Sequence, residues 1–278
     1  MSRAKRSLSQ HFLVDPNLQR KIVAALEARA DEAVLEIGPG HGELSRHLVG
    51  RVDPLVLVEK DDDLARELET RWGARPDVVV VHGDALEVDL SAELPGDRPY
   101  RVLSNLPYAV TSPLLFRVLA LEPPPRRIVV TMQKEVADRL AADPDGGEYG
   151  SLTVGVRSRA DVRRAFDVSP NAFRPRPDVE STTVVLTPDP ERIRRLPAGP
   201  LRRLTRAAFS RRRKQMQKIL RSAPEFALER ETAEAHLRAV GAEPRHRPER
   251  LSPEQFVALA RRLEQGRAPG EGDGGAVR

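Results

Sequence analysis

The sequence predicts an α/β protein with a doubly wound, mostly parallel sheet and a small all-α C-terminal domain. Short β-branched runs recur along the first half of the chain, and each is followed by a stretch with helical spacing. These runs are almost continuously apolar, which is typical of parallel strands that are covered on both faces. The 278 residues are enough for one large and one small domain.

The expected strands follow one another in chain order. Five parallel strands are expected, at Ala33–Ile37, Leu55–Val58, Val78–Val81, Arg101–Leu103 and Ile128–Thr131. After Gly150 the pattern changes, and Ser151–Arg157 and Thr182–Thr187 are expected to form an antiparallel, hairpin-like pair. The Pro-punctuated loop Ser169–Asp178 lies between them.

Prolines and glycines mark the domain limits. Two closely spaced prolines end the α/β domain, which is expected at residues 1–190. The chain then reads as helices interrupted by Pro and Gly, and Ser252 followed by Pro253 is typical of a helix N-terminus. A small basic helical domain is therefore expected at residues 191–265. The Gly-rich residues 266–278 have little to pack and are expected to form a disordered tail.

Charge is distributed unevenly along the chain. Residues 1–100 carry 13 basic and 19 acidic side chains, whereas residues 101–278 carry 33 and 22. The densest basic run, Leu201–Arg221, holds nine Lys and Arg and no acid. A solvated helix face would explain some of these charges, but contact with a phosphate backbone explains the purity of the run better. The candidate phosphate-binding residues are Arg211, Arg212, Arg213, Lys214, Lys218 and Arg221.

Composition excludes several classes of function. The chain has no Cys, which excludes disulfides, thiolate catalysis and Cys-ligated zinc. The six His lack a metal-binding spacing, so no metal is expected. We find no apolar stretch that would form a signal peptide or a membrane span, and no heptad repeat. A cytoplasmic monomer without membrane contact is therefore expected.

A glycine-rich turn follows the first expected strand and leads into an expected helix at Leu44–Val49. Residues Glu36–Glu43 read EIGPGHGE, and such a turn lets the backbone approach a ligand closely. A tight turn without a ligand is the alternative. Glu43 stands where a dinucleotide site would have its third Gly, and its negative charge disfavours a diphosphate. No Gly-Lys-Ser/Thr follows, so a phosphate-binding loop is excluded and the turn favours a nucleoside without phosphates.

Acidic residues at the ends of the next two strands fit the same ligand. Glu59 lies 21 residues after Gly38, where doubly wound folds place the acid that binds a ribose diol. Asp84 and Ala85 end the third strand, where a carboxylate accepts from the amine of an adenine and a backbone N–H donates to the ring. S-adenosylmethionine (AdoMet) has these groups and no phosphate.

The fourth strand ends in Ser-Asn-Leu-Pro-Tyr, which is suited to an amine substrate. Adenine's amine is a poor nucleophile because its lone pair is delocalised, so a catalyst gains by accepting its hydrogen bonds. The Asn105 side chain and the Leu106 carbonyl supply acceptors, Pro107 stiffens the turn, and Tyr108 offers a ring for stacking. These four residues are the candidate catalytic turn.

Several ordered motifs resemble a known family. Besides EIGPGHG, GDA and NLPY, they include Ser9–Leu13 (SQHFL), Gln133–Leu140 (QKEVADRL), Tyr149–Leu152 (YGSL) and Ser169–Ser181 (SPNAFRPRPDVES). Over residues 5–222 the chain resembles the KsgA/RsmA dimethyladenosine transferases, whose sister branch is the Erm methylases. The resemblance implies a Rossmann-like class I AdoMet-dependent methyltransferase sheet. It also implies transfer of two methyl groups to each of two adjacent adenosines in the 3′-terminal hairpin of 16S rRNA, within the small subunit or its precursor.

The resemblance also implies roles for individual residues. The implied cofactor-binding residues are His11, Leu13, Gly38, Gly40, Glu59, Asp84, Ala85 and Asn105. His11 stands where the family usually has Asn. Phe173 resembles a second aromatic that would sandwich the flipped adenine against Tyr108.

Two alternatives remain open at this stage. An Erm-type enzyme would act on 23S rRNA and give macrolide resistance. A ribosome assembly factor would act mainly by binding, with methylation secondary. A DNA or protein amine methylase is disfavoured because such enzymes often have Pro where Leu106 stands.

Overall fold

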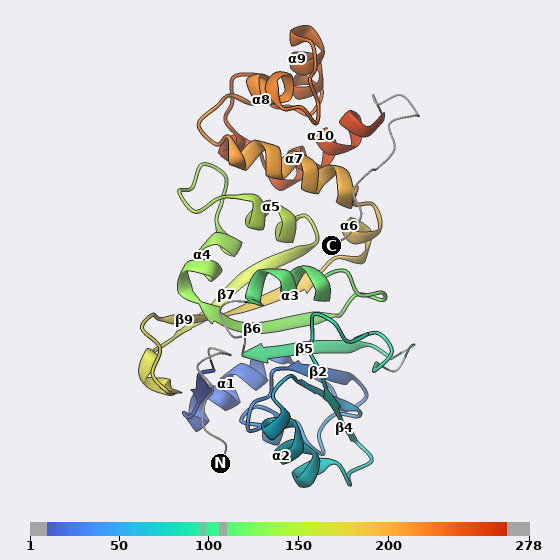
Figure 1. Cartoon of the computed structure of the whole chain (residues 1–278), viewed down its shortest axis with the longest axis vertical. Helices are drawn as coiled ribbons and strands as arrows, with labels where there is room; N and C mark the ends of the chain where they lie inside the picture. Colours follow the sequence, from blue (N-terminus) through green and yellow to red (C-terminus); the bar gives the residue numbers. More distant parts are fainter. Residues whose placement is uncertain (1–9, 95, 97, 106–109, 266–278) are drawn as a thin grey trace. The chain divides into compact units, whose positions relative to one another are not determined.

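The computed structural model describes residues 10–94, 96, 98–105 and 110–265 (Figure 1). The chain divides into two compact units. The first extends to Ala141 and also includes Arg159–Ile193, whereas the second combines Ala142–Ser158 with the chain from Arg194 onward. The expected continuous domain over residues 1–190 is therefore interrupted, and the expected tail at 266–278 lies outside the described residues.

In the described part of the chain, seven strands form a mixed sheet in the order β4-β3-β2-β5-β6-β9-β7. They are β2 (Ala33–Ile37), β3 (Leu55–Glu59), β4 (Val78–His82), β5 (Tyr100–Asn105), β6 (Arg127–Gln133), β7 (Ala160–Val168) and β9 (Ser181–Pro188). Strands β2 to β6 are parallel, and β9 is antiparallel to both β6 and β7. The predicted doubly wound α/β sheet is confirmed, and an antiparallel pair closes it, although that pair is formed by β7 and β9 and not by the pair of segments that the sequence analysis expects.

Helices bury the sheet on both faces. The helices of the first unit are α1 (Pro16–Leu26), α2 (Asp62–Trp72), α3 (Thr111–Val118) and α4 (Lys134–Ala141). Every residue of β2 and β3 is buried, which explains their continuous apolar character. On one face, Val34 of β2 and Leu103 of β5 share a core with Ile22 of α1. Helix α1 begins at Asp15, whose Oδ1 accepts the Asn17 and Leu18 N–H groups at 2.8 and 3.1 Å.

The segment after the glycine turn is less helical than the sequence analysis predicts. Instead of a helix over Leu44–Val49, a single 3-10 turn forms at Ser45–His47. Gly42 and Gly50 bound this segment with φ values of +78° and +74°, so the backbone leaves the right-handed helical region on either side. Seven residues, enough for about two helical turns, lie between these glycines, and only Ser45–His47 forms a regular 3-10 turn.

The prediction of a strand at Ser151–Arg157 is wrong, because this segment is helix α5. Its start is fixed by Thr153, whose Oγ1 accepts the Gly150 N–H at 3.0 Å. The apolar residues that suggested a strand are buried against α7 (Ala198–Ser210) and α10 (Pro253–Gln265) of the second unit instead. Besides β6, the antiparallel partner of β9 is β7, which the sequence analysis does not expect because β7 is rich in charge and its alternation is broken at the adjacent Arg163 and Arg164.

The second unit is helical, as predicted. Its helices are α5 (Ser151–Arg157), α7 (Ala198–Ser210), α8 (Met216–Ser222), α9 (Arg230–Arg238) and α10 (Pro253–Gln265), with α6 (Pro190–Arg194) at the junction. The predicted start of α10 is confirmed by Ser252, whose Oγ accepts the Gln255 N–H at 3.2 Å. A core around Tyr149 and Phe256 holds these helices together. None of the described helices combines the length and apolar character needed to cross a membrane.

Candidate functional site: a pocket at the carboxyl ends of the parallel strands

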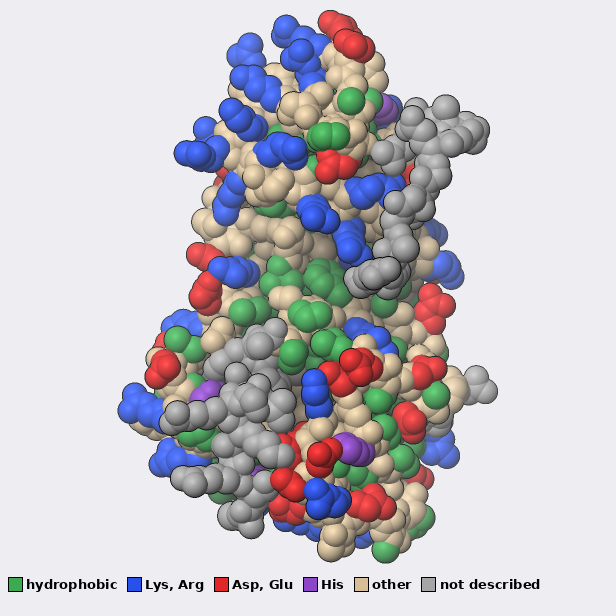
Figure 2. All heavy atoms as spheres, viewed as in Figure 1, with side chains coloured by type: hydrophobic (Ala, Val, Ile, Leu, Met, Phe, Trp, Pro, Cys, Tyr) green, Lys and Arg blue, Asp and Glu red, His purple; other side chains and the backbone are tan. Residues whose placement is uncertain are grey.

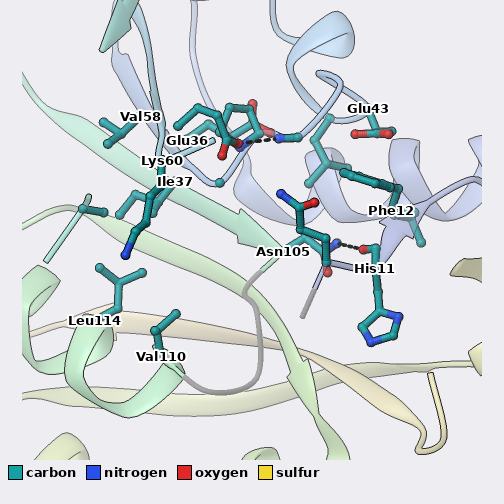
Figure 3. A pocket seen from close by; sticks show the side chains of 18 of the residues that line it. His11, Phe12, Glu36, Ile37, Glu43, Val58, Lys60, Asn105, Val110 and Leu114 are labelled. Carbon is teal, nitrogen blue, oxygen red and sulfur yellow. Dashed lines mark hydrogen bonds between the residues drawn. The ribbon is translucent and has the colours of Figure 1, made fainter. Parts of the chain in front are cut away.

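A pocket of about 260 Å³ lies where β2, β3, β4 and β5 end (Figure 3). This is close to the lower end of the range for small-molecule sites, about 300–1,000 Å³. Open α/β sheets bind ligands at this edge. All eight residues with an expected cofactor role line the pocket, together with Phe173: His11, Leu13, Gly38, Gly40, Glu59, Asp84, Ala85 and Asn105. Leu106, Pro107 and Tyr108 of the candidate catalytic turn lie outside the described residues.

The glycine turn forms one wall of the pocket with its backbone. Gly38 has φ +67° and Gly40 has φ +62°, a region that favours glycine. A Cβ at Gly38 would meet no atom within 4 Å and would project into open space. A Cβ at Gly40 would lie 3.1 Å from the Phe12 ring and 3.2 Å from Glu43 Oε2. A ligand therefore has direct access to the backbone of this turn.

Glu59 ends β3 at the bottom of the pocket, with only 5% of its surface exposed. Its Oε2 accepts the Gly40 N–H at 3.1 Å, and its Oε1 accepts the Asp61 N–H at 2.9 Å. Burial raises the pKa of Glu59, although these two hydrogen bonds oppose the shift. Each oxygen keeps a second lone pair, so the carboxylate has the acceptor pair that a ribose diol requires.

Asp84 follows β4 and is held by two donors. Its Oδ2 lies 2.6 Å from Lys60 Nζ, and its Oδ1 accepts the Leu86 N–H at 2.9 Å. The hydrogen bond from Lys60, followed by that from Leu86, holds the pKa of Asp84 below its usual range. The carboxylate is therefore an acceptor in a fixed position at one end of the pocket.

Asn105 ends β5 and is oriented by the N-terminal segment. Its Nδ2 donates to the His11 carbonyl at 3.2 Å (Figure 3). The other end of the amide, the acceptor Oδ1, therefore points away from the His11 carbonyl. The His11 Nδ1–H in turn donates to the Pro175 carbonyl at 2.8 Å. The segment that covers the pocket therefore sets the orientation of the Asn105 side chain.

A two-stranded ribbon joins this N-terminal segment to the loop after β7. Strand β1 (Phe12–Leu13) pairs antiparallel with β8 (Phe173–Arg174), and the Val14 N–H donates to the Ala172 carbonyl at 2.8 Å. Phe173 is only 1% exposed and belongs to the main core. The Phe173 ring is therefore accessible only to a group that enters the pocket. Its expected stacking against a base stays a prediction.

Buried acids that the sequence analysis did not assign also line the pocket. Glu36 is completely buried, which raises its pKa to about 8, and its Oε2 has no hydrogen-bond partner in the described structure. Burial also raises the pKa of Glu43. The signal in the sequence was an acid inside the apolar strand Ala33–Ile37, which is expensive unless a ligand or a neighbour compensates.

The second unit carries a basic groove of about 860 Å³. Its lining includes all six of the predicted phosphate-binding residues, Arg211, Arg212, Arg213, Lys214, Lys218 and Arg221, with Phe209, Ser210 and Ser222. The groove forms where α7 ends and α8 begins, and its basic side chains come from the turn between them and from α8. Lys and Arg gather over these elements in Figure 2.

Among the described residues, no group of three or more His, Asp or Glu is placed to hold a metal ion.

The parallel sheet, the glycine turn and the acid at the end of β3 are those of a class I methyltransferase, and solved structures agree. The chain is similar to a dimethyladenosine transferase from Plasmodium falciparum, with a TM-score of 0.80 and 25% identity over 91% of this chain and 98% of that one. It is also similar to the 23S rRNA methyltransferase ErmE, with a TM-score of 0.68 and 27% identity over 91% and 100% of the chains.

A family model for ribosomal RNA adenine dimethylase matches residues 1–265, and the chain belongs to this family. It is therefore an AdoMet-dependent enzyme that methylates adenine in ribosomal RNA. The chain is 38% identical to the ribosomal RNA small subunit methyltransferase A of Geobacter metallireducens, over 94% of this chain and 96% of the relative. It is 40% identical to the protein of the same name from Myxococcus xanthus, over 94% and 91% of the two chains.

Proposed function

We propose that this protein transfers methyl groups from AdoMet to the N6 amines of two adjacent adenosines in the 3′-terminal hairpin of 16S rRNA. Its substrate would be the small ribosomal subunit or its precursor. The observation that carries the proposal is the pocket at the strand ends, where a diol acceptor, an amine acceptor and Asn105 converge. The small-subunit methyltransferases among its relatives favour this target over 23S rRNA.

The described residues fit AdoMet by shape and by chemistry. Glu59 would accept from both ribose hydroxyls, and Asp84 would accept from the adenine amine beside the Ala85 backbone. The open backbone at Gly38 leaves space for the amino-acid portion. Glu36, buried and unpartnered at Oε2, favours a ligand that carries positive charge, as the sulfonium and ammonium groups of AdoMet do.

When bound, AdoMet would supply an electrophilic methyl group on its sulfonium. Asn105 would accept a hydrogen bond from the target amine through Oδ1, since its Nδ2 is already engaged by His11. This contact would favour a tetrahedral amine nitrogen, whose lone pair is less delocalised into the ring. No strong base is required, because the amine becomes acidic only as it is alkylated. Leu106, Pro107, Tyr108 and Phe173 complete the proposed catalytic set.

The basic groove would hold the phosphate backbone of the RNA. Its six Lys and Arg side chains lie within 11 residues of chain, from Arg211 to Arg221, and supply charge that a polyanion neutralises. Arg212 also donates to the Gly146 carbonyl at 3.2 Å, so part of its role is to stabilise the groove itself. We further propose that the enzyme acts as a cytoplasmic monomer.

Methyl transfer from labelled AdoMet to unmethylated small and large subunits, measured in parallel, tests the proposal. We expect N6,N6-dimethyladenosine near the 3′ end of 16S rRNA only. Asn105→Ala should reduce transfer by far more than it weakens AdoMet binding. Label in 23S rRNA would assign the protein to the Erm branch instead.

A role in assembly by binding alone is the second candidate, because the basic groove and the pocket belong to different units. Glu59→Ala separates the two functions, since it removes a pocket residue and leaves the groove intact. If this variant still supports subunit assembly, the binding role is the main one.

A further inference from the structure

Two exposed arginines follow Phe173 in the loop after β7. Arg174 is the next residue of the two-residue strand β8, and Arg176 lies two residues further along. Figure 1 shows this part of the chain, in yellow, beside β1. Successive side chains of a strand point to opposite faces. Because Phe173 is buried and lines the pocket, the exposed Arg174 side chain points outward from the pocket's edge.

The guanidinium group of Arg174 is held by the loop itself. Its Nη1 donates to the Phe173 carbonyl at 2.9 Å and to the Asn171 carbonyl at 3.3 Å. Its Nε and Nη2 have no acceptor among the residues that the structure describes. These two groups form one edge of the planar guanidinium, and their spacing matches two oxygens of a phosphate. Arg174 is therefore a fixed arginine whose binding edge is still available.

Neither arginine forms an ion pair with a described residue. Other arginines of the first unit do form ion pairs, for example Arg75 with Asp77 at 2.9 Å. Glu180, which ends the same loop, pairs with Lys134 at 2.7 Å. Arg176 stands between two prolines, which restrict the backbone that presents it. The loop therefore presents two positive charges that are available to an anion.

The charged groups that accompany a base are the phosphates on either side of its sugar. An enzyme that acts on a base in RNA turns the nucleotide out about its backbone, so the base enters the pocket and the phosphates stay outside. Phe173 is the residue expected to stack on that base, and Arg174 is its immediate neighbour with the opposite direction. The arginines are therefore placed where the phosphates of the extruded nucleotide would lie.

We propose that Arg174 and Arg176 bind the phosphates that flank the target adenosine. This contact is made by the first unit and holds the extruded nucleotide at the pocket, whereas the basic groove belongs to the second unit. The inference rests on the proposed function and deepens it, since it names the part of the RNA that this loop recognises.

Three substitutions and a control test the charge and the shape of these side chains. Arg174→Gln and Arg176→Gln each remove a charge and keep a polar side chain. Arg174→Lys keeps the charge and loses the planar edge. Arg51→Gln is the matched control, because Arg51 is also exposed, has no ion pair with a described residue and does not line the pocket.

The measurement is single-turnover methylation of unmethylated small subunits at increasing enzyme concentration. Each Gln variant should raise the half-saturating concentration about three- to tenfold, because a charge-assisted contact with phosphate is lost. Arg174→Lys should lie between Arg174→Gln and the wild type, and Arg51→Gln should match the wild type. The rate at saturation should change by less than about twofold, because neither arginine touches the reacting atoms. A loss confined to the saturating rate would overturn the proposal.

A change in the RNA identifies the group that the arginines contact. A methylphosphonate, which replaces a charged phosphate oxygen by methyl, is placed on one side or the other of a target adenosine. It is carried by a synthetic 3′ segment that is ligated to 16S rRNA before the subunits are reconstituted. A 2′-O-methyl group on the preceding sugar protects the linkage, and the reference RNA has this group beside an ordinary phosphate.

The two changes form a double-mutant cycle. For the wild type, a methylphosphonate on at least one side should raise the half-saturating concentration about three- to tenfold. For the enzyme with both arginines replaced by Gln, the same RNA should cause a change of less than about twofold. Equal losses in the two proteins, or no loss in the wild type on either side, would overturn the phosphate contact.

A purely structural role of Arg174 would give a different result. Loss of its hydrogen bonds to the loop would lower the urea midpoint and would weaken binding equally for both kinds of RNA. Arg176 has no such bond to a described residue, so Arg176→Gln tests the phosphate contact even if Arg174→Gln disturbs the loop.

The same assay distinguishes failure of this inference from failure of the proposed function. If the wild type does not methylate small subunits that carry ordinary RNA, the proposed function is wrong and the inference falls with it. If the wild type methylates them and the arginine variants behave as it does, only the inference about the arginines is overturned.

Discussion

Replacement of Glu59 by Gln is the most direct test of the pocket. The carboxylate accepts two backbone N–H groups in the free protein, one on each oxygen, at 3.1 Å from Gly40 and 2.9 Å from Asp61. The proposed ribose diol would add one further hydrogen bond to each oxygen. Gln has a single acceptor oxygen, so its NH₂ group must face both a backbone donor and a ribose hydroxyl.

The expected loss follows from the hydrogen bonds that Gln cannot make. A hydrogen bond to a charged group contributes about 1.5–3 kcal/mol, which corresponds to a loss of about 10- to 100-fold in affinity for AdoMet or S-adenosylhomocysteine. The free protein should also lose about 1–3 kcal/mol of stability, because one buried backbone donor is left without an acceptor. Calorimetric titration gives the first quantity, and urea unfolding gives the second.

Controls make this test decisive. Glu69→Gln carries the same chemical change on an exposed position of α2 and should alter neither quantity. RNA binding through the basic groove should also be unchanged in Glu59→Gln. A change in ligand affinity of less than about threefold, in a variant that is folded, would refute the assignment of Glu59 to the ribose.

The remaining predictions concern a second buried acid of the pocket, the basic groove and a buried ion pair. Burial raises the pKa of Glu36 to about 8, so the native state keeps this carboxyl protonated over a range in which the unfolded chain loses the proton, and the free energy of unfolding falls as pH rises from about 4.5 to 8. Glu36→Gln should flatten this pH dependence, measured by urea unfolding at pH 5, 6.5 and 8. Wild-type and variant stabilities that change with pH in the same way would contradict the prediction. The association constant for RNA falls as the salt concentration rises, and replacement of Arg211 and Arg213 by Ala should make the slope of this log–log plot shallower by about 0.9 for each lost contact with a duplex phosphate. An unchanged slope would exclude both residues from phosphate contact. Arg101 pairs with the buried Glu32 at 2.6 Å, so Arg101→Met should cost about 3–5 kcal/mol in thermal or urea unfolding. Although burial opposes it, the hydrogen bond from Arg101 lowers the pKa of Glu32, and the stability that this pair contributes should therefore be lost as pH falls below about 4.5.

The candidate site was predictable from the sequence where its residues are local to strand ends. Glu59, Asp84 and Asn105 each follow an apolar run, and parallel strands bring their carboxyl ends to one edge of the sheet. Their convergence on one pocket therefore follows from strand order alone. The contact between Lys60 and Asp84 and the burial of Glu36 did not follow, because both depend on how other elements pack around these residues.

Contacts between distant segments were also beyond the sequence analysis. Phe12 lies opposite Arg174 in the β1–β8 ribbon, although they are 162 positions apart in the sequence, and neither two-residue strand carries a periodic pattern. The helix at Ser151–Arg157 was mistaken for a strand because a run that is rich in Leu, Val and Thr suits either structure when it is short and buried. Burial against α7 and α10 decided between them.

The sequence by itself determined the α/β class, the five parallel strands, the residues at the strand ends and the basic character of the C-terminal helices. These features depend on periodicity, apolar continuity and charge, which are local properties of the chain. Only the tertiary structure decided which unit residues 142–158 join, how the N-terminal segment orients Asn105, and which ion pair holds Asp84. Those features depend on which surfaces meet, and the free energy of burying them is shared among segments that are far apart in sequence.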